Sequence, residues 1–102
     1  MSKIAIVGEF ETKPGRHAEF ETLIRNHAKK CLEIEPGTLR FELLHPFDEY
    51  GTRIPNRLMV SELFADQAAV EFHRSTNRMA EVAAQFATLT ERARLVLAEV
   101  EG

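Results

Sequence analysis

The hydrophobic period of the chain changes at residues 13–15 (KPG), and this change constrains the fold most. The segment before it, "KIAIVGEFET" (3–12), is short and rich in β-branched residues, which is typical of a strand. After it, from 16 to 35, apolar residues recur every three or four positions, which predicts an amphipathic helix. Its apolar face consists of Phe20, Leu23, Ile24, His27, Cys31 and Ile34. The turn signal at 35–37 (EPG) ends the helix, because proline disfavours helical geometry at the residue before it.

Two further strands are predicted downstream, at 38–45 (TLRFELLH) and 57–64 (RLMVSELF). In the first of them, one face is predicted to carry Leu39, Phe41, Leu43 and His45. The connection at 46–56 contains two prolines and a glycine and has no period, so it is a loop. A loop of this length is either a functional lid or a plain flexible connection.

Two helices and a last strand complete the chain. Asp66 can cap the first helix through its side-chain oxygen, and this short helix ends near His73. Ser75 or Thr76 can cap the second, whose apolar face consists of Met79, Val82, Ala83, Phe86 and Leu89. The segment "ARLVLAEV" (93–100) is predicted to be the last strand.

The resulting order, β-α-β-β-α-α-β, predicts an α+β fold of the ferredoxin-like, split βαβ type. In this fold a four-stranded antiparallel sheet is covered by helices on one face, and 102 residues suit a single domain spanning 1–102. The other sheet face would carry apolar side chains such as Ala5, Val7 and Leu44. An exposed apolar face favours a partner, and we expect an identical subunit.

Composition limits the partners. The net charge is −3, and Lys29 and Lys30, the one adjacent basic pair, lie among acidic neighbours, which argues against nucleic acid. The apolar stretch before Gly8 is too short for a signal-peptide core or a membrane span, so we expect a cytoplasmic protein with no membrane contact. Cys31 is the single cysteine, which excludes an intrachain disulfide and fits a reducing compartment.

Three segments in register resemble the antibiotic biosynthesis monooxygenase domain family. They are "KPGRHAEFETLI" (13–24), "EPGTLRFEL" (35–43) and "VSELFADQAAVEFHRSTNRMAEVAAQF" (60–86). The last contains a strand ending in Glu-x-aromatic, a short helix ending in His, and a small polar residue before a second helix. The resemblance implies a homodimeric α/β barrel in which each subunit holds a pocket between its sheet and its helices.

Members of this family include cofactor-free oxygenases of polycyclic phenols and quinols, haem-degrading proteins, and an isomerase of a small phosphorylated hydroxyketone. Fold therefore does not fix function. Many members have a second histidine where this chain has Arg78, and tryptophan where it has Phe64. Because the chain has no tryptophan at all, the haem-degrading branch is disfavoured.

The resemblance implies that His73 is a catalytic base. An ordinary histidine pKa of ~6.5 allows proton transfer near neutrality. Glu62 shares a strand face with apolar residues and could orient His73 or take a proton itself. The alternatives are that His73 only closes a helix, where the dipole favours its charge, and that Glu62 forms an ion pair with Arg40 or Arg78.

The expected substrate-binding residues are Phe41, Met59, Phe64, Met79, His27 and Arg78. A lone histidine on an apolar helix face, such as His27, is more often a core residue, and Cys31 on the same face is more often inert. We expect no metal and no cofactor, because the chain has no HxH, HExxH or CxxC motif and no glycine-rich phosphate loop.

The sequence thus favours a cofactor-independent, monooxygenase-like enzyme that abstracts a proton from a small phenolic, quinol or carbonyl compound. One alternative is a non-catalytic small-molecule binding module on the same dimer. Another is an isomerase of a small phosphorylated hydroxyketone, for which Arg40 or Arg78 could hold the phosphate.

Overall fold

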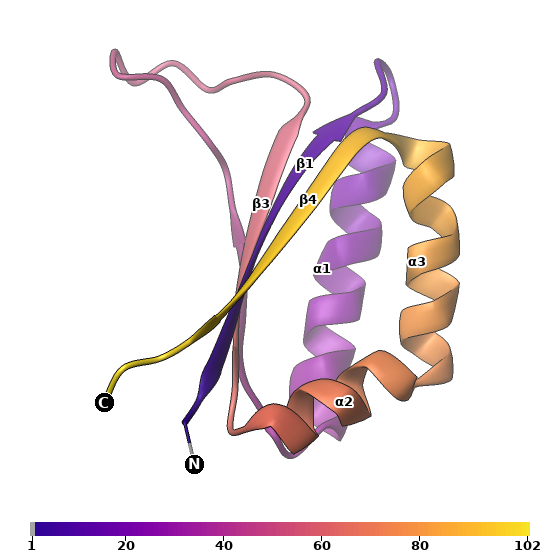
Figure 1. The fold of residues 1–102 in the computed structure, drawn as a ribbon. Helices are drawn as coiled ribbons and strands as arrows, with labels where there is room; N and C mark the ends of the chain where they lie inside the picture. Colours follow the sequence, from indigo (N-terminus) through magenta and orange to yellow (C-terminus); the bar gives the residue numbers. More distant parts are fainter. Residues whose placement is uncertain (1) are drawn as a thin grey trace.

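The computed structural model describes residues 2–102 and has the predicted order of elements. The elements are β1 (Ile4–Thr12), α1 (His17–Ile34), β2 (Thr38–Leu44), β3 (Arg57–Phe64), α2 (Gln67–Ser75), α3 (Asn77–Leu89) and β4 (Thr90–Glu99). The four strands form one antiparallel sheet in the order β2-β3-β1-β4, and the helices lie on one face of it (Figure 1). This arrangement confirms the predicted α+β, ferredoxin-like fold.

The two central strands alternate between a buried and an open face. In β3, Leu58, Val60, Glu62 and Phe64 point toward the helices and are buried. In β1, Gly8 lies between Val60 and Leu95, and a Cβ there would lie 2.8 Å from Val60 Cγ2. The sheet therefore needs a residue without a side chain at position 8, because its neighbours fill the space.

The aromatic core lies between β1, α1 and α3. The rings of Phe10 and Phe20 lie 5.1 Å apart, and Phe86 lies 5.4 Å from Phe10. Such offset and edge-on pairs stabilise a core beyond simple burial. This cluster packs the first turn of α1 and the last turn of α3 against the sheet.

A bulge near the start of β2 corrects one expectation. Thr38 pairs with Phe64, but Arg40 pairs with Leu63, so Leu39 is an extra residue in the ladder. Leu39 is therefore exposed rather than on the face of Phe41, and Thr38 is buried instead.

The predicted helix caps are present. Asp66 Oδ1 accepts a hydrogen bond from the Ala69 amide at 2.9 Å, and Thr76 Oγ1 accepts one from the Met79 amide at 3.1 Å. The last strand begins at Thr90, three residues before the predicted start, because α3 ends directly at Leu89 with no loop between them. Within residues 2–102, no helix is both long and apolar enough to cross a membrane.

The connection between β2 and β3 extends away from the helices (Figure 1). It has local order: Asp48 Oδ1 accepts hydrogen bonds from the amides of Tyr50 and Thr52, both at 2.9 Å, and Phe47 pairs with Arg53. The loop therefore lies on the side of the sheet that the helices leave open.

Candidate functional site

His73 lies in the interior, on the inner face of α2. Val70 and His73 are one helical turn apart and both are buried, whereas the neighbouring Phe72 is exposed. The Asp66 cap sets where α2 begins and thereby which face of this short helix meets the sheet. His73 is therefore not a solvent-exposed residue that only closes a helix.

Glu35 holds the His73 ring. Its Oε1 lies 2.8 Å from His73 Nδ1 and accepts a hydrogen bond from Thr38 Oγ1 at 2.8 Å, while Oε2 pairs with the Arg78 guanidinium. Burial alone would raise the Glu35 pKa, but the hydrogen bonds from Thr38 and His73 outweigh it and lower the pKa. An ionised carboxylate only accepts hydrogen bonds, so Nδ1 carries a proton, and in the neutral form of the ring Nε2 is the acceptor.

Glu62 faces the other side of the same ring. Its Oε1 lies 3.8 Å from His73 Nε2, and both side chains are buried. Burial, followed by the charge of Glu35, raises the Glu62 pKa to about 7, although Arg74 opposes the shift. Near neutral pH this carboxyl group therefore exists in both protonation states, which suits a group that gives or takes a proton.

The expected ion pair between Glu62 and an arginine is absent from the described residues. Arg78 pairs with Glu35, and Arg40 lies beside Glu42 and Ser61 on the open face of the sheet. That alternative for Glu62 is wrong, because Arg40 and Glu62 occupy positions of opposite phase in neighbouring strands.

His27 and Cys31 lie one turn apart on α1, next to His73. Cys31 Sγ is 3.6 Å from His27 Nε2 and 3.7 Å from His73 Nδ1. Burial lowers the His27 pKa to about 4, helped by the charges of His73 and Arg78. Burial and the charge of Glu35 raise the Cys31 pKa to about 12. Both side chains are therefore neutral at physiological pH.

A small apolar cavity of about 80 Å³ adjoins these groups. It is lined by Ile6, Phe10, Ile24, His27, Phe41, Val60, Glu62, His73, Arg74, Met79, Phe86 and Leu95. Among them, Leu95 and Arg74 are exposed, so the cavity reaches solvent next to these two side chains. The cavity thus combines an apolar wall with one histidine pair and one carboxyl group.

Three of the six expected substrate-binding residues, His27, Phe41 and Met79, line this cavity. Phe64 packs against the His73 ring, with centroids 5.1 Å apart, and does not line it. Met59 does not line this cavity either: it lies out of phase with Val60, on the open face of the sheet, where it borders another hollow. Arg78 holds Glu35 and is not a lining residue.

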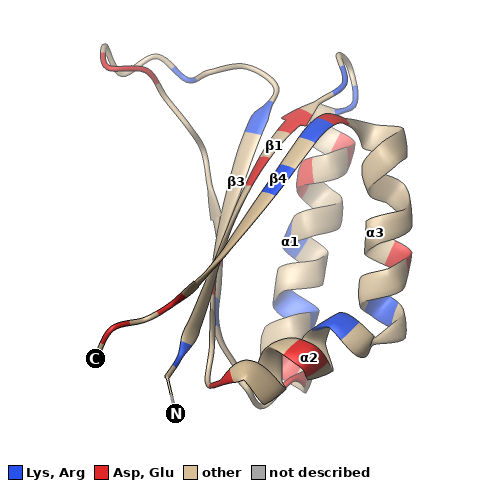
Figure 2. Ribbon diagram, in the orientation of Figure 1, with Lys and Arg blue, Asp and Glu red and all other residues tan. Residues whose placement is uncertain are grey.

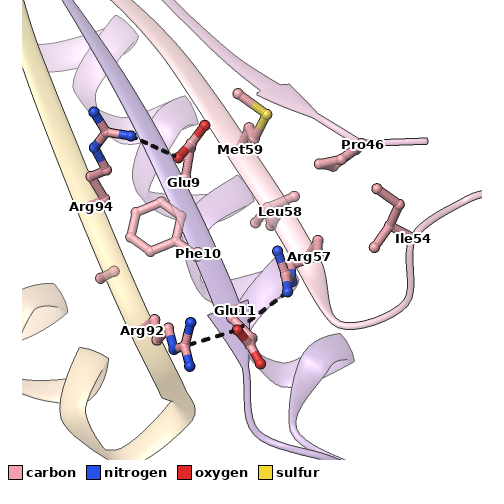
Figure 3. Close-up of a pocket in the computed structure, with 11 residues that line it drawn as sticks. Glu9, Phe10, Glu11, Pro46, Ile54, Arg57, Leu58, Met59, Arg92 and Arg94 are labelled. Carbon is pink, nitrogen blue, oxygen red and sulfur yellow. Dashed lines mark ion pairs between the residues drawn. The ribbon is translucent and has the colours of Figure 1, made fainter. Parts of the chain in front are cut away.

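A second hollow of about 640 Å³ lies on the open face of the sheet (Figure 3). Ion pairs cross it: Arg94 lies 3.8 Å from Glu9, while Arg57 and Arg92 lie 3.4 Å and 3.9 Å from Glu11. Figure 2 shows these charges of both signs on neighbouring strands. Pro46 and Ile54 of the β2–β3 loop border this hollow and not the His73 cavity.

Sequence reasoning missed Glu35, which we had interpreted only as the end of a helix. A signal was available, because positions 27, 31 and 35 are spaced by four and therefore follow one helical face. The spacing therefore places Glu35 on the same side of the helix as His27 and Cys31.

The chain belongs to the antibiotic biosynthesis monooxygenase family, whose family model matches residues 3–85. This finding confirms the resemblance seen in the sequence. No curated protein matches the chain.

Solved structures share the fold. Protein SO0527 from Shewanella oneidensis has a TM-score of 0.85 at 23% identity, over 97% of this chain and 91% of that one. A proposed antibiotic biosynthesis monooxygenase from Caulobacter crescentus CB15 has a TM-score of 0.85 at 24% identity, over 99% and 92%. NE2512, a protein of unknown function from Nitrosomonas europaea, has a TM-score of 0.79 at 26% identity, over 100% and 92%. Family membership supports a monooxygenase-like or small-molecule-binding role.

Proposed function

We propose that this protein is a cofactor-independent enzyme that abstracts a proton from a small phenolic, quinol or carbonyl compound, with His73 as the base. One observation carries the proposal: Glu35 holds His73 Nδ1 at 2.8 Å, so that Nε2 is the free acceptor beside an apolar cavity. A carboxylate that fixes the histidine tautomer is a recurring arrangement for a catalytic base.

Two carboxyl groups flank the ring, and their different surroundings give them different roles. Glu35 is ionised and orients His73, whereas Glu62, with a pKa of about 7, can hold a proton beside Nε2. In the proposed step, Nε2 takes the proton of a substrate O–H or C–H bond and leaves a phenolate or enolate. Protonated Glu62 stabilises the developing anion or returns a proton to it. Neighbouring groups whose pKa values are driven apart are typical of acid–base pairs.

As a monooxygenase, the enzyme would use dioxygen as its second substrate. The anion made by His73 is the electron donor: one oxygen atom enters the substrate as a carbonyl group, and the other leaves as water with two hydrogen atoms from the substrate. The enclosed, apolar wall favours this chemistry because it excludes water from the reactive anion. Family membership supports this part of the proposal.

The size of the cavity favours a small substrate. Its volume of about 80 Å³ is less than the ~150 Å³ of a cavity known to hold benzene. A polycyclic compound would therefore require the wall to open, and the exposed Leu95 is the place where it could do so. A single ring or a short carbonyl compound needs a smaller rearrangement.

We also infer a homodimer formed through the open face of the sheet. Val7, Leu44 and Val96 are each more than one third exposed there. A stable interface on this face should bury more than ~1,000 Å² in total. Light scattering at micromolar concentration should give twice the mass of one chain, and a monomer would contradict the dimer.

The base is tested by replacing His73. Purified protein is incubated with single-ring hydroquinones, phenols and cyclic 1,3-diketones, and two quantities are measured: dioxygen uptake and exchange of the acidic C–H proton with deuterated solvent. His73→Asn should lower the rate ~10²–10⁴-fold for the compounds that the protein accepts. His45→Asn is the matched control, because His45 lies beside Glu21, away from the cavity, and should leave the rate unchanged. Equal rates in both variants would refute the role of His73.

A binding module on the same fold remains the second candidate, favoured by the small apolar cavity. It would bind compounds of this panel with neither dioxygen uptake nor proton exchange. The isomerase alternative has less support, since Arg78 is engaged by Glu35 and Arg40 lies on the open face. Among the described residues, Arg74 is the one cation that lines the cavity.

A further inference from the structure

Three potential metal ligands meet between α1 and α2. One nitrogen of His27, one nitrogen of His73 and Cys31 Sγ all lie within 4.8 Å of one another. The chain supplies two of them from one face of α1 and the third from a helix 42 residues beyond Cys31. Imidazole and thiolate are the ligands that Zn²⁺ prefers in proteins.

The spacing of these atoms fits tetrahedral coordination. Bonds of about 2.3 Å to sulfur and about 2.0 Å to nitrogen, at a tetrahedral angle, put the two ligand atoms about 3.5 Å apart. Cys31 Sγ lies 3.6 Å from His27 Nε2 and 3.7 Å from His73 Nδ1. Cys31 Sγ also lies 3.8 Å from His27 Nδ1, so the His27 ring has to turn about its side-chain bonds before Nε2 points at an ion shared with Cys31.

Glu35 lies beside this set and is not one of its members. Its Oε1 lies 2.8 Å from His73 Nδ1, with the Nδ1 proton between them. An ion bound to Nδ1 would take the place of that proton. Oε2 stays paired with Arg78.

We propose that His27, Cys31 and His73 form a three-ligand site for a divalent, thiolate-binding ion of the Zn²⁺ class. This site differs from the expectation of no metal, because the chain contains none of the familiar contiguous zinc motifs. The fold brings these ligands together because α2 crosses the end of α1.

The surrounding groups suit an ion at this position. When Nδ1 binds the ion, Nε2 carries the proton and points toward Glu62, which lies 3.8 Å away. A metal-bound histidine that donates its other N–H to a carboxylate is the usual arrangement around zinc. Cys31 releases its thiol proton to solvent when it binds the ion, and the charges of the ion and Arg78 are then balanced by this thiolate and the carboxylates of Glu35 and Glu62.

An ion at this site would affect the proposed function in one way. This effect rests on the proposed function, whereas the metal site itself does not. A metal-bound His73 carries its remaining proton on Nε2 and has no free acceptor for a substrate proton. The ion would thus inhibit proton abstraction. Binding itself is independent of any substrate.

The site is tested with Co²⁺ and the reduced full-length chain, without substrate. A tetrahedral Co²⁺–thiolate site gives a sulfur-to-metal charge-transfer band and strong visible absorption, and both should saturate at one ion per chain and disappear when Zn²⁺ is added. His27→Asn should weaken Co²⁺ binding at least about tenfold, and Cys31→Ser should abolish the charge-transfer band. His45→Asn should behave like the unmodified chain.

Each variant is first checked for its fold by circular dichroism, and Cys31→Ala replaces Cys31→Ser if the latter unfolds. A weak, octahedral spectrum at one equivalent of Co²⁺, or an unchanged spectrum in His27→Asn, would overturn the proposal. Failure of His73→Asn to alter turnover would refute the proposed function but not the metal site, because the two are read from different signals.

Discussion

The two faces of one sheet carry similar charged residues in contrasting settings. On the helix side, Glu62 is 5% exposed, His73 4% and Glu35 2%. On the open side, Glu9 pairs with Arg94, and their side chains are 54% and 73% exposed. The pairs on the open side are in contact with water, whereas those on the helix side are in contact with aromatic rings.

This contrast shows that the size of a hollow is a poor guide to chemistry. The groove on the open face is about 640 Å³ and the inner cavity about 80 Å³, yet the strongly shifted pKa values belong to residues around the smaller one. Exclusion of water shifts a pKa, because the charged form loses its solvation. The inner face therefore holds the candidate site, and the outer face suits a second subunit.

The largest effect is expected for Glu35→Ala. It removes the partner of the buried Thr38 and His73 and of the partly buried Arg78, and breaking a buried ion pair typically costs ~3–5 kcal/mol of unfolding free energy. The matched change on the open face, Glu11→Ala, should cost less than ~1 kcal/mol. Urea denaturation of both variants measures the difference; equal losses would contradict the contrast between the faces.

A smaller, pH-dependent effect is expected from Glu62. Its pKa rises from 4.5 to about 7 on folding, so the stability associated with its neutral form is complete below pH ~4.5 and is lost as the pH rises through 7. Relative to Glu62→Gln, the unmodified chain should lose about 3 kcal/mol of unfolding free energy between pH 4.5 and pH 8. Parallel pH profiles for the two chains would show that the Glu62 pKa is not raised.

Gly8→Ala should lower the unfolding free energy by about 1–3 kcal/mol. The added methyl group meets Val60 and Leu95 on the filled inner face, with the nearest atom at 2.8 Å, and overpacking costs about that much. Ala5→Val adds more volume to the open face and should cost less than ~0.5 kcal/mol in a free chain. Thermal unfolding of the two variants would rank them, and a harmless Gly8→Ala would mean that the inner face is less tightly packed than described.

The smallest effect is expected for Glu9→Gln, which breaks the exposed pair with Arg94. An exposed pair contributes ~0.2–1 kcal/mol and is screened by salt, so the unfolding free energy should change little and the change should vanish at high salt. A larger loss that persists in salt would show that this face is covered, and unfolding at several protein concentrations would reveal whether a second subunit covers it.

The sequence alone determined the order of elements and their ends. The change of hydrophobic period, the proline-containing turns and the caps at Asp66 and Thr76 are local signals, and each acts within a few residues. The bulge at Leu39 was not foreseen, because it depends on how β2 pairs with β3 rather than on β2 itself. The start of β4 was predicted three residues late, because α3 ends at Leu89 and β4 follows it without a loop.

The tertiary structure decided which residues meet. Glu62 and His73 could be placed near each other from their strand and helix, but their third partner, Glu35, comes from the end of α1, 38 residues before His73. No local pattern encodes that distance, because it depends on how α2 crosses the end of α1. The shifted pKa values depend in turn on the burial of all three groups, which is a property of the packed layers and not of any one segment.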